Sequence, residues 1–432
     1  MTPDRPRLDS WKEIAQYLGR DVRTVIRWEL DRGLPVSRVP GGKRSRVFAY
    51  QDDLDQWLSQ SPDASEAPVP TPPPGDGPRW PQPLLVLGLL AAVAALASLP
   101  GPAAGAAPVR LGLTDSDLQA FDRRDQLMWS RRVTTTRVMA SATRWSFVGH
   151  LDADRTPDLL AAIAATPPPV EPMGGEWLRL AGDATLWRYT AGGDAAWSTT
   201  VADEVQFRDD KYGPPWALAD LTVHRVGGRQ RIAWAVHHFT WWPSLLISLD
   251  ETGRRLGTFA NAGWIRSVEA TPDGRHLLVT GVSNAQRSYF LAVLDASHPV
   301  GHSPEPPGSP TECVSCDAGD PVKYFVWPRT DVSTTSPFPA DGPSVSTFAT
   351  GDVHVHVHES AGPLIATTIY ELSADLNLQA ARFSDAFWER HEELHRSGAL
   401  SHARDECPER TGRQVKVWTP ALGWQALTVS VR

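Results

Sequence analysis

Three histidines alternate with valines in the segment Gly-Asp-Val-His-Val-His-Val-His-Glu, residues 351–359. Successive side chains of a β-strand point to opposite faces, so His354, His356 and His358 would share one face of a strand. Imidazoles two residues apart on such a face can bind the same Zn²⁺ ion. A half-buried strand with a polar outer face explains the same alternation without a metal, and we favour that interpretation.

Three aspartates, Asp152, Asp154 and Asp158, follow a strand-like segment. Carboxylates at this spacing suit a hard cation, so the sequence requires no cofactor but is compatible with bound calcium. The segment 145–163 resembles an FG-GAP/VCBS propeller repeat, and the resemblance implies that its acidic loop binds calcium. Arg155 stands where that family has glycine, so a solvated acidic turn without an ion is the alternative.

Cys313 and Cys316 form a Cys-x-x-Cys pair in a loop rich in proline and glycine. A thioredoxin-like redox pair would lie at a strand-to-helix junction, and no such pattern flanks this one. A structural zinc site would need a second ligand pair. We therefore expect a disulfide that closes the loop, which requires a compartment outside the cytoplasm. The third cysteine, Cys407, has no assigned role.

A segment His-Glu-Glu-Leu-His begins at His391. It looks like the His-Glu-x-x-His motif of zincin metallopeptidases, in which His391 and His395 would bind zinc and Glu392 would act as general base. The third ligand would have to be His402 or Glu406. Because this helix is densely charged, whereas a zincin helix is apolar and buried in a catalytic cleft, a membrane-bound zinc metallopeptidase is only the alternative function.

The first sixty residues predict a small helical unit. Ser10 and Glu13 form a capping box, and Gly19 ends the helix that it opens. A second helix begins after Asp21 and ends before Gly33. The apolar spacing turns inward the residues Trp11, Ile14, Ala15, Leu18, Val22, Val25 and Ile26. Two short helices joined by a glycine-containing turn form a helix-turn-helix arrangement.

A basic hairpin is predicted next, because two short extended runs flank Gly41-Gly42. A third helix, over residues 52–58, returns Leu54 and Trp57 to the core. The side chains available to bind DNA are Arg20, Arg23, Thr24 and Arg27 on the second helix and Arg38, Lys43, Arg44 and Arg46 near the hairpin tip.

Residues 10–50 resemble the winged helix-turn-helix of the MerR/excisionase class, with the same order of helix, helix, wing and short helix. The resemblance implies that Arg23, Thr24 and Arg27 face the major groove and that the basic residues of the wing contact phosphates. Arginine can read guanine through two hydrogen bonds, so this composition fits DNA recognition. A small protein-interaction module with a solvated basic face is the alternative.

A long uncharged segment separates this unit from the rest of the chain. No charged residue occurs between Arg79 and Arg110, and residues 84–99 are entirely apolar or small. Since about 20 apolar residues cross the hydrocarbon core, we expect one transmembrane helix over residues 80–105. A buried helix of a soluble domain is the alternative, although such helices usually carry a polar stripe. The Pro-rich residues 61–79 predict an extended tether.

Residues 110–432 predict a mainly-β, propeller-like domain with one late helix over residues 375–397. Short runs containing Val, Ile and Thr alternate with Gly, Pro, Asp and Asn, and most of the 18 Trp residues lie here. A turn-plus-strand unit recurs at residues 145–163, 216–236 and 268–281. Repeats separated by tens of residues are typical of propellers and related β arrays.

The 432-residue chain has a formal net charge of −8, which excludes a globally basic nucleic-acid-binding protein, so DNA binding must come from one local patch. The order of winged helix (1–60), linker, span and outer domain resembles the ToxR-like plan of membrane-bound one-component transcription regulators. An excisionase-type recombination accessory would need neither the span nor the outer domain.

The ToxR-like plan implies a single-pass protein of the bacterial inner membrane that is not an enzyme. Its N-terminus would be cytoplasmic and its C-terminal domain periplasmic or extracellular. The expected partners are double-stranded DNA, membrane lipid and an extracytoplasmic ligand or protein, and a homodimer is compatible with the plan.

Overall fold

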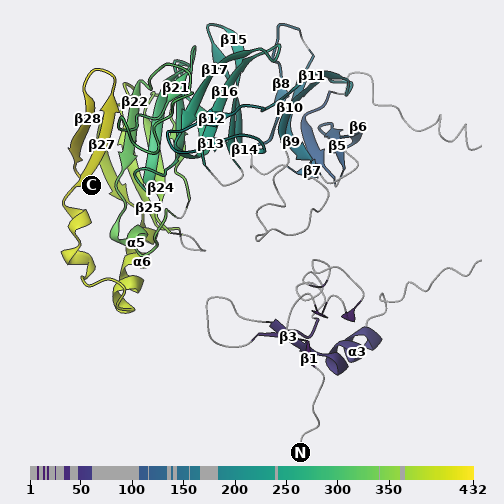
Figure 1. Cartoon of the computed structure of the whole chain (residues 1–432), viewed down its shortest axis with the longest axis horizontal. Coiled ribbons are helices and arrows are strands. Elements are labelled where there is room, and N and C mark those ends of the chain that lie inside the picture. The colour runs from purple at the N-terminus through teal and green to yellow at the C-terminus, as the bar shows by residue number, and fades with distance from the viewer. Residues whose placement is uncertain are drawn as a thin grey trace, which may run out of the picture. The chain divides into compact units, whose positions relative to one another are not determined.

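The computed structural model of the chain describes residues 7–8, 13–14, 17–18, 25, 34–38, 47–60, 107–114, 116–133, 138–139, 144–154, 156–165, 183–238, 242–339, 341–360 and 365–432. The chain divides into two compact units, Met1–Leu99 and Pro100–Arg432. Each unit is described by itself, and both are drawn in Figure 1.

The N-terminal unit contains a three-stranded antiparallel sheet in the order β1-β3-β2. Its elements are β1 (Arg7–Leu8), β2 (Ser37–Arg38), β3 (Val47–Tyr50) and the helix α3 (Gln51–Gln60). Among the described residues of this unit, the buried core contains Ile14, Val25, Leu34, Ala49 and Leu54.

The sequence pattern of this unit agrees with the described part of it. Residues 13, 14, 17 and 25 are helical, and Ile14, Val25 and Leu54 are fully buried, as the amphipathic spacing predicts. Strands β2 and β3 pair as the predicted hairpin. The third helix is present as α3.

Several predicted features lie outside the described residues. These are the tether 61–79, the expected span over 80–105, and the side chains of Arg20, Arg23, Thr24, Arg27, Arg38, Lys43, Arg44 and Arg46. In the part of the chain that is described, no helix combines the length and the apolar character that a bilayer crossing requires.

The described C-terminal unit is built mainly of β-strands, which confirms the predicted fold class for this region. The first sheet contains β4 (Arg110–Leu113), β5 (Asp117–Phe121) and β6 (Leu127–Arg132). The second contains β7 (Val138–Met139), β8 (Ser146–Gly149), β9 (Asp158–Ala165), β10 (Ala184–Tyr189) and β11 (Ala195–Thr200). A short pair follows, β12 (Val205–Gln206) and β13 (Lys211–Tyr212).

Three further sheets follow in this unit. The third contains β14 (Trp216–Val226), β15 (Arg229–His238), β16 (Ser244–Asp250), β17 (Arg255–Asn261) and β21 (Gly301–His302). The fourth contains β18 (Gly263–Ala270), β19 (His276–Ser283), β20 (Ser288–Asp295), β22 (Lys323–Trp327), β27 (Arg413–Thr419) and β28 (Gly423–Val429). The fifth contains β23 (Ser344–Thr347), β24 (Val353–His358), β25 (Thr367–Leu372) and β26 (Leu378–Phe383).

These five sheets pack face to face in chain order, and a layer of buried side chains lies between each pair of neighbours. Strand β20 shows how one strand serves two layers. Tyr289 and Leu291 point toward the fifth sheet, whereas Phe290 and Ala292 point toward the third. A strand covered on both faces therefore reads as a continuous apolar run. Figure 1 shows the first and second sheets at one end of this unit (β5, β6, β9 and β10), the fourth and fifth at the other (β22, β24, β25 and β27), and the third between them (β15–β17).

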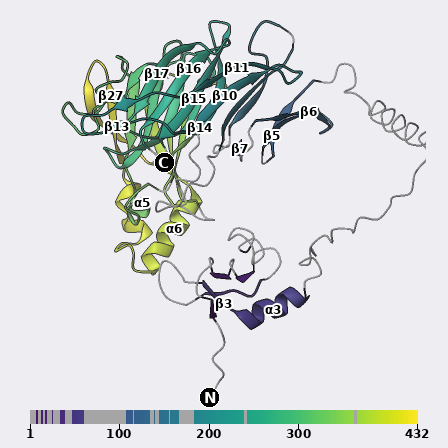
Figure 2. The same ribbon diagram turned by 45° about the vertical axis from the view of Figure 1, so that its right-hand side comes forward.

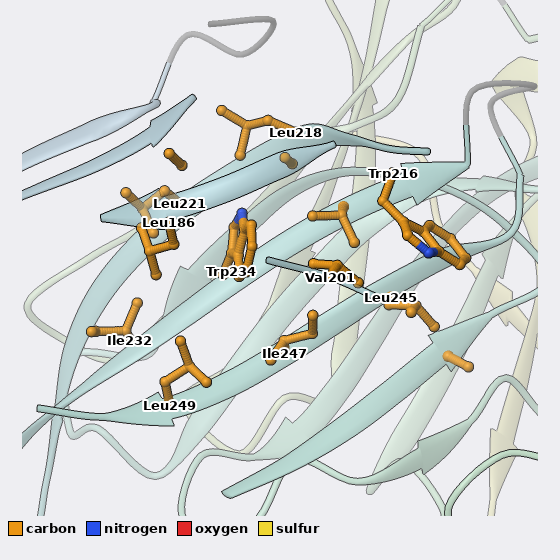
Figure 3. Close-up of a cluster of buried hydrophobic side chains, with 14 of the residues drawn as sticks. Leu186, Val201, Trp216, Leu218, Leu221, Ile232, Trp234, Leu245, Ile247 and Leu249 are labelled. Carbon is orange, nitrogen blue, oxygen red and sulfur yellow. The ribbon is translucent and has the colours of Figure 1, made fainter. Parts of the chain in front are cut away.

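The layer between the second and third sheets is centred on large aromatic side chains. Trp234 on β15 and Trp216 on β14 are almost fully buried. Figure 3 shows Trp234 among aliphatic side chains from both sheets, with Leu186 on β10 and Ile247 on β16 nearby.

The three turn-plus-strand units found in the sequence correspond to neighbouring strand pairs in three successive sheets. They are β8–β9, β14–β15 and β18–β19, each antiparallel. The register shifts between Leu218 and Asp220 in β14 and between Ile265 and Ser267 in β18. Bulges at matching places in the two pairs support the interpretation of the sheets as repeated units.

The helix predicted over residues 375–397 is shorter than expected. Helix α6 covers Asp385–Arg396, and Ser384 caps it by accepting a hydrogen bond from the Phe387 amide. The preceding residues form strand β26, which pairs with β25. Cross-strand pairing and burial of Ala380 and Ala381 outweigh the helical spacing there. Figures 1 and 2 show α6 beside the short helix α5 (Asp331–Thr334).

Candidate functional site

The predicted DNA-binding unit has its hairpin at the edge of the three-stranded sheet. Arg38 on β2 pairs with Val47 on β3, and Ser37 pairs with Phe48. Residues 39–46, which include three basic residues, therefore connect two paired antiparallel strands. This connectivity is that of a β-hairpin.

Two side-chain contacts at the surface of this unit join β1 to the hairpin and Tyr17 to helix α3. The Arg7 guanidinium lies 4.2 Å from the centre of the Phe48 ring, a cation–π contact between β1 and β3. The Tyr17 hydroxyl donates a hydrogen bond of 2.9 Å to Asp55 on α3, and this bond raises the pKa of Tyr17. The unit is therefore joined across its surface as well as through its core.

The acidic turn has an arginine where the calcium prediction places a cation. Arg188 on β10 donates from Nε to Asp158 at 2.9 Å and from Nη2 to Asp152 at 2.5 Å. Asp154 accepts instead from the backbone and hydroxyl of Thr156, which lowers its pKa. The calcium prediction is not supported, because the guanidinium already neutralises two of the three carboxylates.

The alternating histidines form the half-buried strand that we favoured. Along β24 the valines are buried and His354, His356 and His358 are half-buried. The Nε2 atoms of His356 and His358 lie 3.2 Å from the hydroxyls of Ser346 and Ser344, respectively. Each of these imidazoles thus has a hydroxyl partner on β23, and burial lowers the pKa of both. The contacts offer no support for a shared zinc ion.

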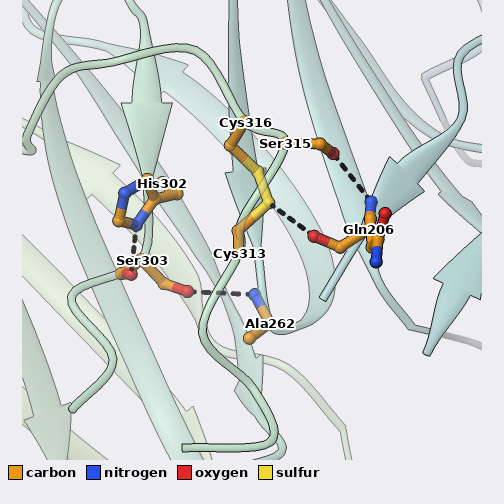
Figure 4. Close-up of a disulfide and its surroundings, with 7 residues drawn as sticks. All are labelled: Gln206, Ala262, His302, Ser303, Cys313, Ser315 and Cys316. Atoms are coloured by element: carbon orange, nitrogen blue, oxygen red, sulfur yellow. Dashed lines mark hydrogen bonds between the residues drawn. A yellow bond between two sulfur atoms is a disulfide. The ribbon is translucent and has the colours of Figure 1, made fainter. Parts of the chain in front are cut away.

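Cys313 and Cys316 are joined in a disulfide with a Cα–Cα distance of 5.7 Å. The backbone amide of Gln206 on β12 donates a hydrogen bond of 2.7 Å to the Ser315 hydroxyl. The backbones of Cys313 and Phe207 form an isolated antiparallel β-bridge. Figure 4 shows the disulfide beside Gln206. The closed loop therefore lies against β12, and both sulfurs pack against the core between the second and third sheets.

We expect Cys313 and Cys316 to resist alkylation until the protein is reduced. The test is mass spectrometry of the alkylated Cys407→Ser variant, in which only this pair can react. Since the disulfide closes a very short loop, its contribution to the free energy of unfolding should lie at the low end of about 0–5 kcal/mol. Two free thiols in protein isolated without reductant would contradict the pairing or the extracytoplasmic location.

The two histidines of the His-Glu-x-x-His segment do not share a site. His391 is completely buried, and its Nε2 atom lies 3.2 Å from Nε2 of His402. His395 is exposed and its Nδ1 atom lies 3.3 Å from the Leu400 carbonyl oxygen. Helix α6 turns Phe387, His391 and Leu394 inward, which leaves His395 at the surface. The zincin alternative is therefore not retained.

A different cluster of metal-ligand side chains surrounds His391. One ligand atom each from His391, His402 and Cys407 lies within 4.8 Å of the others. The Oδ2 atom of Asp331, at the start of α5, is 3.3 Å from Nε2 of His402. From the sequence, His402 was a candidate only as a third ligand of the zincin motif, and Cys407 had no assigned role. No local spacing joins these residues, because they come from separate segments.

Comparison with known proteins finds no matching family model and no matching curated protein. Among solved structures, the Dos1 propeller is similar at 10% identity over 73% of this chain and 67% of that one, with a TM-score of 0.34. A protein of unknown function from Bacteroides caccae is similar at 9% identity over 65% of this chain and 94% of that one, with a TM-score of 0.25. Neither TM-score is high enough to carry an inference about this chain.

Proposed function

We propose that the chain is a membrane-anchored one-component transcription regulator that binds promoter DNA through its N-terminal winged helix-turn-helix. The observation that carries the proposal is the pairing of Arg38 with Val47. It makes residues 39–46 the connection of a hairpin, and this stretch of the sequence contains Lys43, Arg44 and Arg46. The buried Ile14, Val25 and Leu54 supply the core that such a unit needs.

The charge distribution supports a local DNA-binding surface. The whole chain carries a formal net charge of −8, so it would be repelled from DNA unless its basic residues were concentrated. Arg20, Arg23 and Arg27 lie within eight consecutive residues at the start of the second predicted helix and just before it. A basic helix followed by a basic wing is the combination that contacts the major groove and the adjacent phosphates.

The remaining parts of the proposal concern the membrane and the signal. We infer that residues 80–105 cross the bacterial inner membrane once and that the tether 61–79 lets the DNA-binding unit reach DNA. The five successive sheets of the C-terminal unit would form a propeller-like sensory domain outside the cytoplasm. Its partner there would be an extracytoplasmic ligand or protein, and DNA sites with two halves would recruit a homodimer.

Substitutions in the N-terminal unit should separate base reading from phosphate binding. For the full chain in detergent, we expect Arg23→Ala or Arg27→Ala to weaken binding to a selected DNA site by about 1–3 kcal/mol. Lys43→Ala or Arg44→Ala should weaken binding to all sequences and lower the salt dependence by about one ion per lost contact. Fluorescence anisotropy over a salt series measures both effects.

The matched control is Arg124→Ala, which removes an exposed arginine from a turn of the C-terminal unit and should leave DNA affinity unchanged. DNA affinity equal to that of the unchanged protein in all four N-terminal variants would refute the proposed interface.

The proposed membrane orientation leads to a second prediction. Alkaline phosphatase is active only outside the cytoplasm, so a fusion after residue 432 should be active and a fusion after residue 60 should be inactive. A β-galactosidase fusion at the same two positions should give the opposite pattern. An active phosphatase after residue 60 would place the basic unit away from DNA and would overturn the regulator proposal.

A further inference from the structure

We propose that His391, His402, Cys407 and Asp331 form a binding site for a zinc ion in the C-terminal unit. The four residues come from four places in the described fold. His391 lies within α6, and Asp331 is the first residue of α5. His402 follows α6, and Cys407 lies between the 3-10 helices η2 (Arg404–Glu406) and η3 (Pro408–Arg410).

The distance between the two imidazoles and the distance between His402 and Asp331 agree with a tetrahedral ion. With zinc–nitrogen bonds of 2.0–2.1 Å, two nitrogens in a tetrahedral site are about 3.4 Å apart. The two Nε2 atoms are separated by 3.2 Å, and Asp331 Oδ2 lies 3.3 Å from the second of them. All three His and Cys ligand atoms lie within 4.8 Å of one another. In a tetrahedral site a nitrogen and a thiolate sulfur are about 3.6 Å apart, so binding requires the thiol and the imidazoles to move closer together.

The buried imidazole of His391 points to a ligand beyond the protein. Its side chain has no exposed surface, and its Nδ1 atom has no hydrogen-bond partner among the described residues. Its Nε2 atom lies 3.2 Å from Nε2 of His402, and in a hydrogen bond between two neutral imidazoles only one of these nitrogens carries the proton. A buried polar group with incomplete hydrogen bonding is costly. Coordination through Nε2 would leave Nδ1 without a partner, so what points to a cation is the convergence of the two Nε2 atoms.

The donor set favours zinc over harder cations. Two imidazoles, one thiolate and one carboxylate combine nitrogen, sulfur and oxygen, whereas calcium and magnesium take oxygen ligands. The thiolate and carboxylate together neutralise a divalent charge. Nearby arginines are already paired with acids, as Arg410 is with Asp405 and Arg413 is with Glu409. The site would therefore be neutral once the ion and the thiolate are in place.

The shape of the site indicates what the ion would do. Four protein ligands leave no open position for water or substrate, which is the arrangement of structural zinc sites. The cluster borders an apolar layer that contains Val332, Phe387 and Leu394. An ion here would fasten α6 and the 3-10 turns to α5. The site is thus distinct from a zincin centre and requires neither His395 nor Glu392.

The test uses the full chain, stripped with a chelator and then titrated with Co²⁺ and Zn²⁺. We expect one ion per chain, visible d–d bands of tetrahedral cobalt, and a near-ultraviolet sulfur-to-cobalt charge-transfer band. Zinc should displace the cobalt and bind with submicromolar affinity. Mass spectrometry of the native protein gives the stoichiometry independently.

Variants assign the ligands. Since even outer-shell partners change metal affinity by about 10–100-fold, removal of a direct ligand should weaken zinc binding more than about 100-fold. Cys407→Ser should also abolish the charge-transfer band, and His402→Gln should weaken binding without unfolding, because His402 is partly exposed. His395→Gln is the matched control on the same helix and should change nothing.

Circular dichroism checks that each variant folds. Asp331→Asn, which keeps the shape of the side chain, provides a milder ligand change if Cys407→Ser unfolds. The absence of stoichiometric binding in the unchanged protein would overturn the proposal. So would binding that survives both Cys407→Ser and His402→Gln in folded protein, or binding that is lost in His395→Gln.

Discussion

Arg144→Met is expected to lower the free energy of unfolding of the C-terminal unit by about 3–5 kcal/mol. Arg144 precedes β8 in the second sheet. It donates from Nε to Asp220 on β14 at 2.8 Å and from Nη1 to Glu269 on β18 at 2.5 Å. A third bond of 2.7 Å reaches the Val268 carbonyl oxygen. One guanidinium therefore joins three successive sheets.

The expected loss is large because Asp220 would stay behind without its main partner. The side chain of Asp220 is 5% exposed, and its Oδ2 atom would retain the Val268 amide at 2.7 Å. An ionised carboxylate that loses its counter-ion inside the protein costs several kcal/mol. Loss of an ion pair of similar length at the exposed surface would lower the free energy of unfolding far less.

Urea unfolding measures the effect. The control is Arg275→Met, because Arg275 is paired with Asp273 at a surface where both side chains are substantially exposed, and such pairs contribute about 0–1 kcal/mol. The double variant Arg144→Met/Asp220→Asn should recover part of the stability lost in Arg144→Met. Equal losses in Arg144→Met and Arg275→Met would show that the buried carboxylate does not depend on Arg144.

Gly281→Ala should be at least as damaging. Gly281 on β19 pairs with Ile265 on β18, and a Cβ at Gly281 would lie 1.8 Å from the Trp264 carbonyl oxygen. Overpacking in a core typically costs about 1–3 kcal/mol, and here the obstructing atom belongs to the backbone of a paired strand. We expect a loss of more than about 3 kcal/mol or failure to fold.

Soluble yield and thermal midpoint measure this effect. Gly192→Ala is the control, since the nearest atoms to a Cβ there are 3.8 Å away and belong to side chains. It should leave both quantities unchanged. A Gly281→Ala protein as stable as Gly192→Ala would mean that β18 and β19 do not approach each other as described.

The N-terminal core could be predicted from the sequence because its signals are local. The spacing of Ile14 and Val25 within short amphipathic segments identifies the buried side chains. Gly41-Gly42 marks the turn that precedes β3, and Leu54 marks the inward face of α3. All of these features act over fewer than ten residues.

The order of the C-terminal sheets could be predicted only in outline. Strand composition and the repeated turn-plus-strand units predicted a serial β array. The return of β27 to pair with β22, as in Phe325 with Val417, joins segments far apart in the chain. The same long-range effect converts residues 378–383 from predicted helix to strand β26, since their partner β25 lies in the neighbouring hairpin.

The candidate sites show the same limit. The acidic spacing of Asp152 and Asp158 suggested calcium, but Arg188 reaches both from another strand. The spacing of His391 and His395 suggested a zinc site made by these two residues. In the structure the residues that lie near His391 are instead His402 and Cys407, from the loops after the helix. Residue spacing indicates which side chains could bind a cation, and tertiary packing decides which of them meet.

The most direct test of the proposed regulator is chromatin immunoprecipitation and sequencing of the tagged full-length protein in its native host. A matched strain would carry the Arg23→Ala/Arg27→Ala/Lys43→Ala/Arg44→Ala variant at equal abundance in the membrane. We predict enrichment at discrete promoter sites that share a sequence motif, and loss of that enrichment in the variant. Equal enrichment in both strains, or no site enriched above an untagged control, would contradict DNA binding as the function of the N-terminal unit.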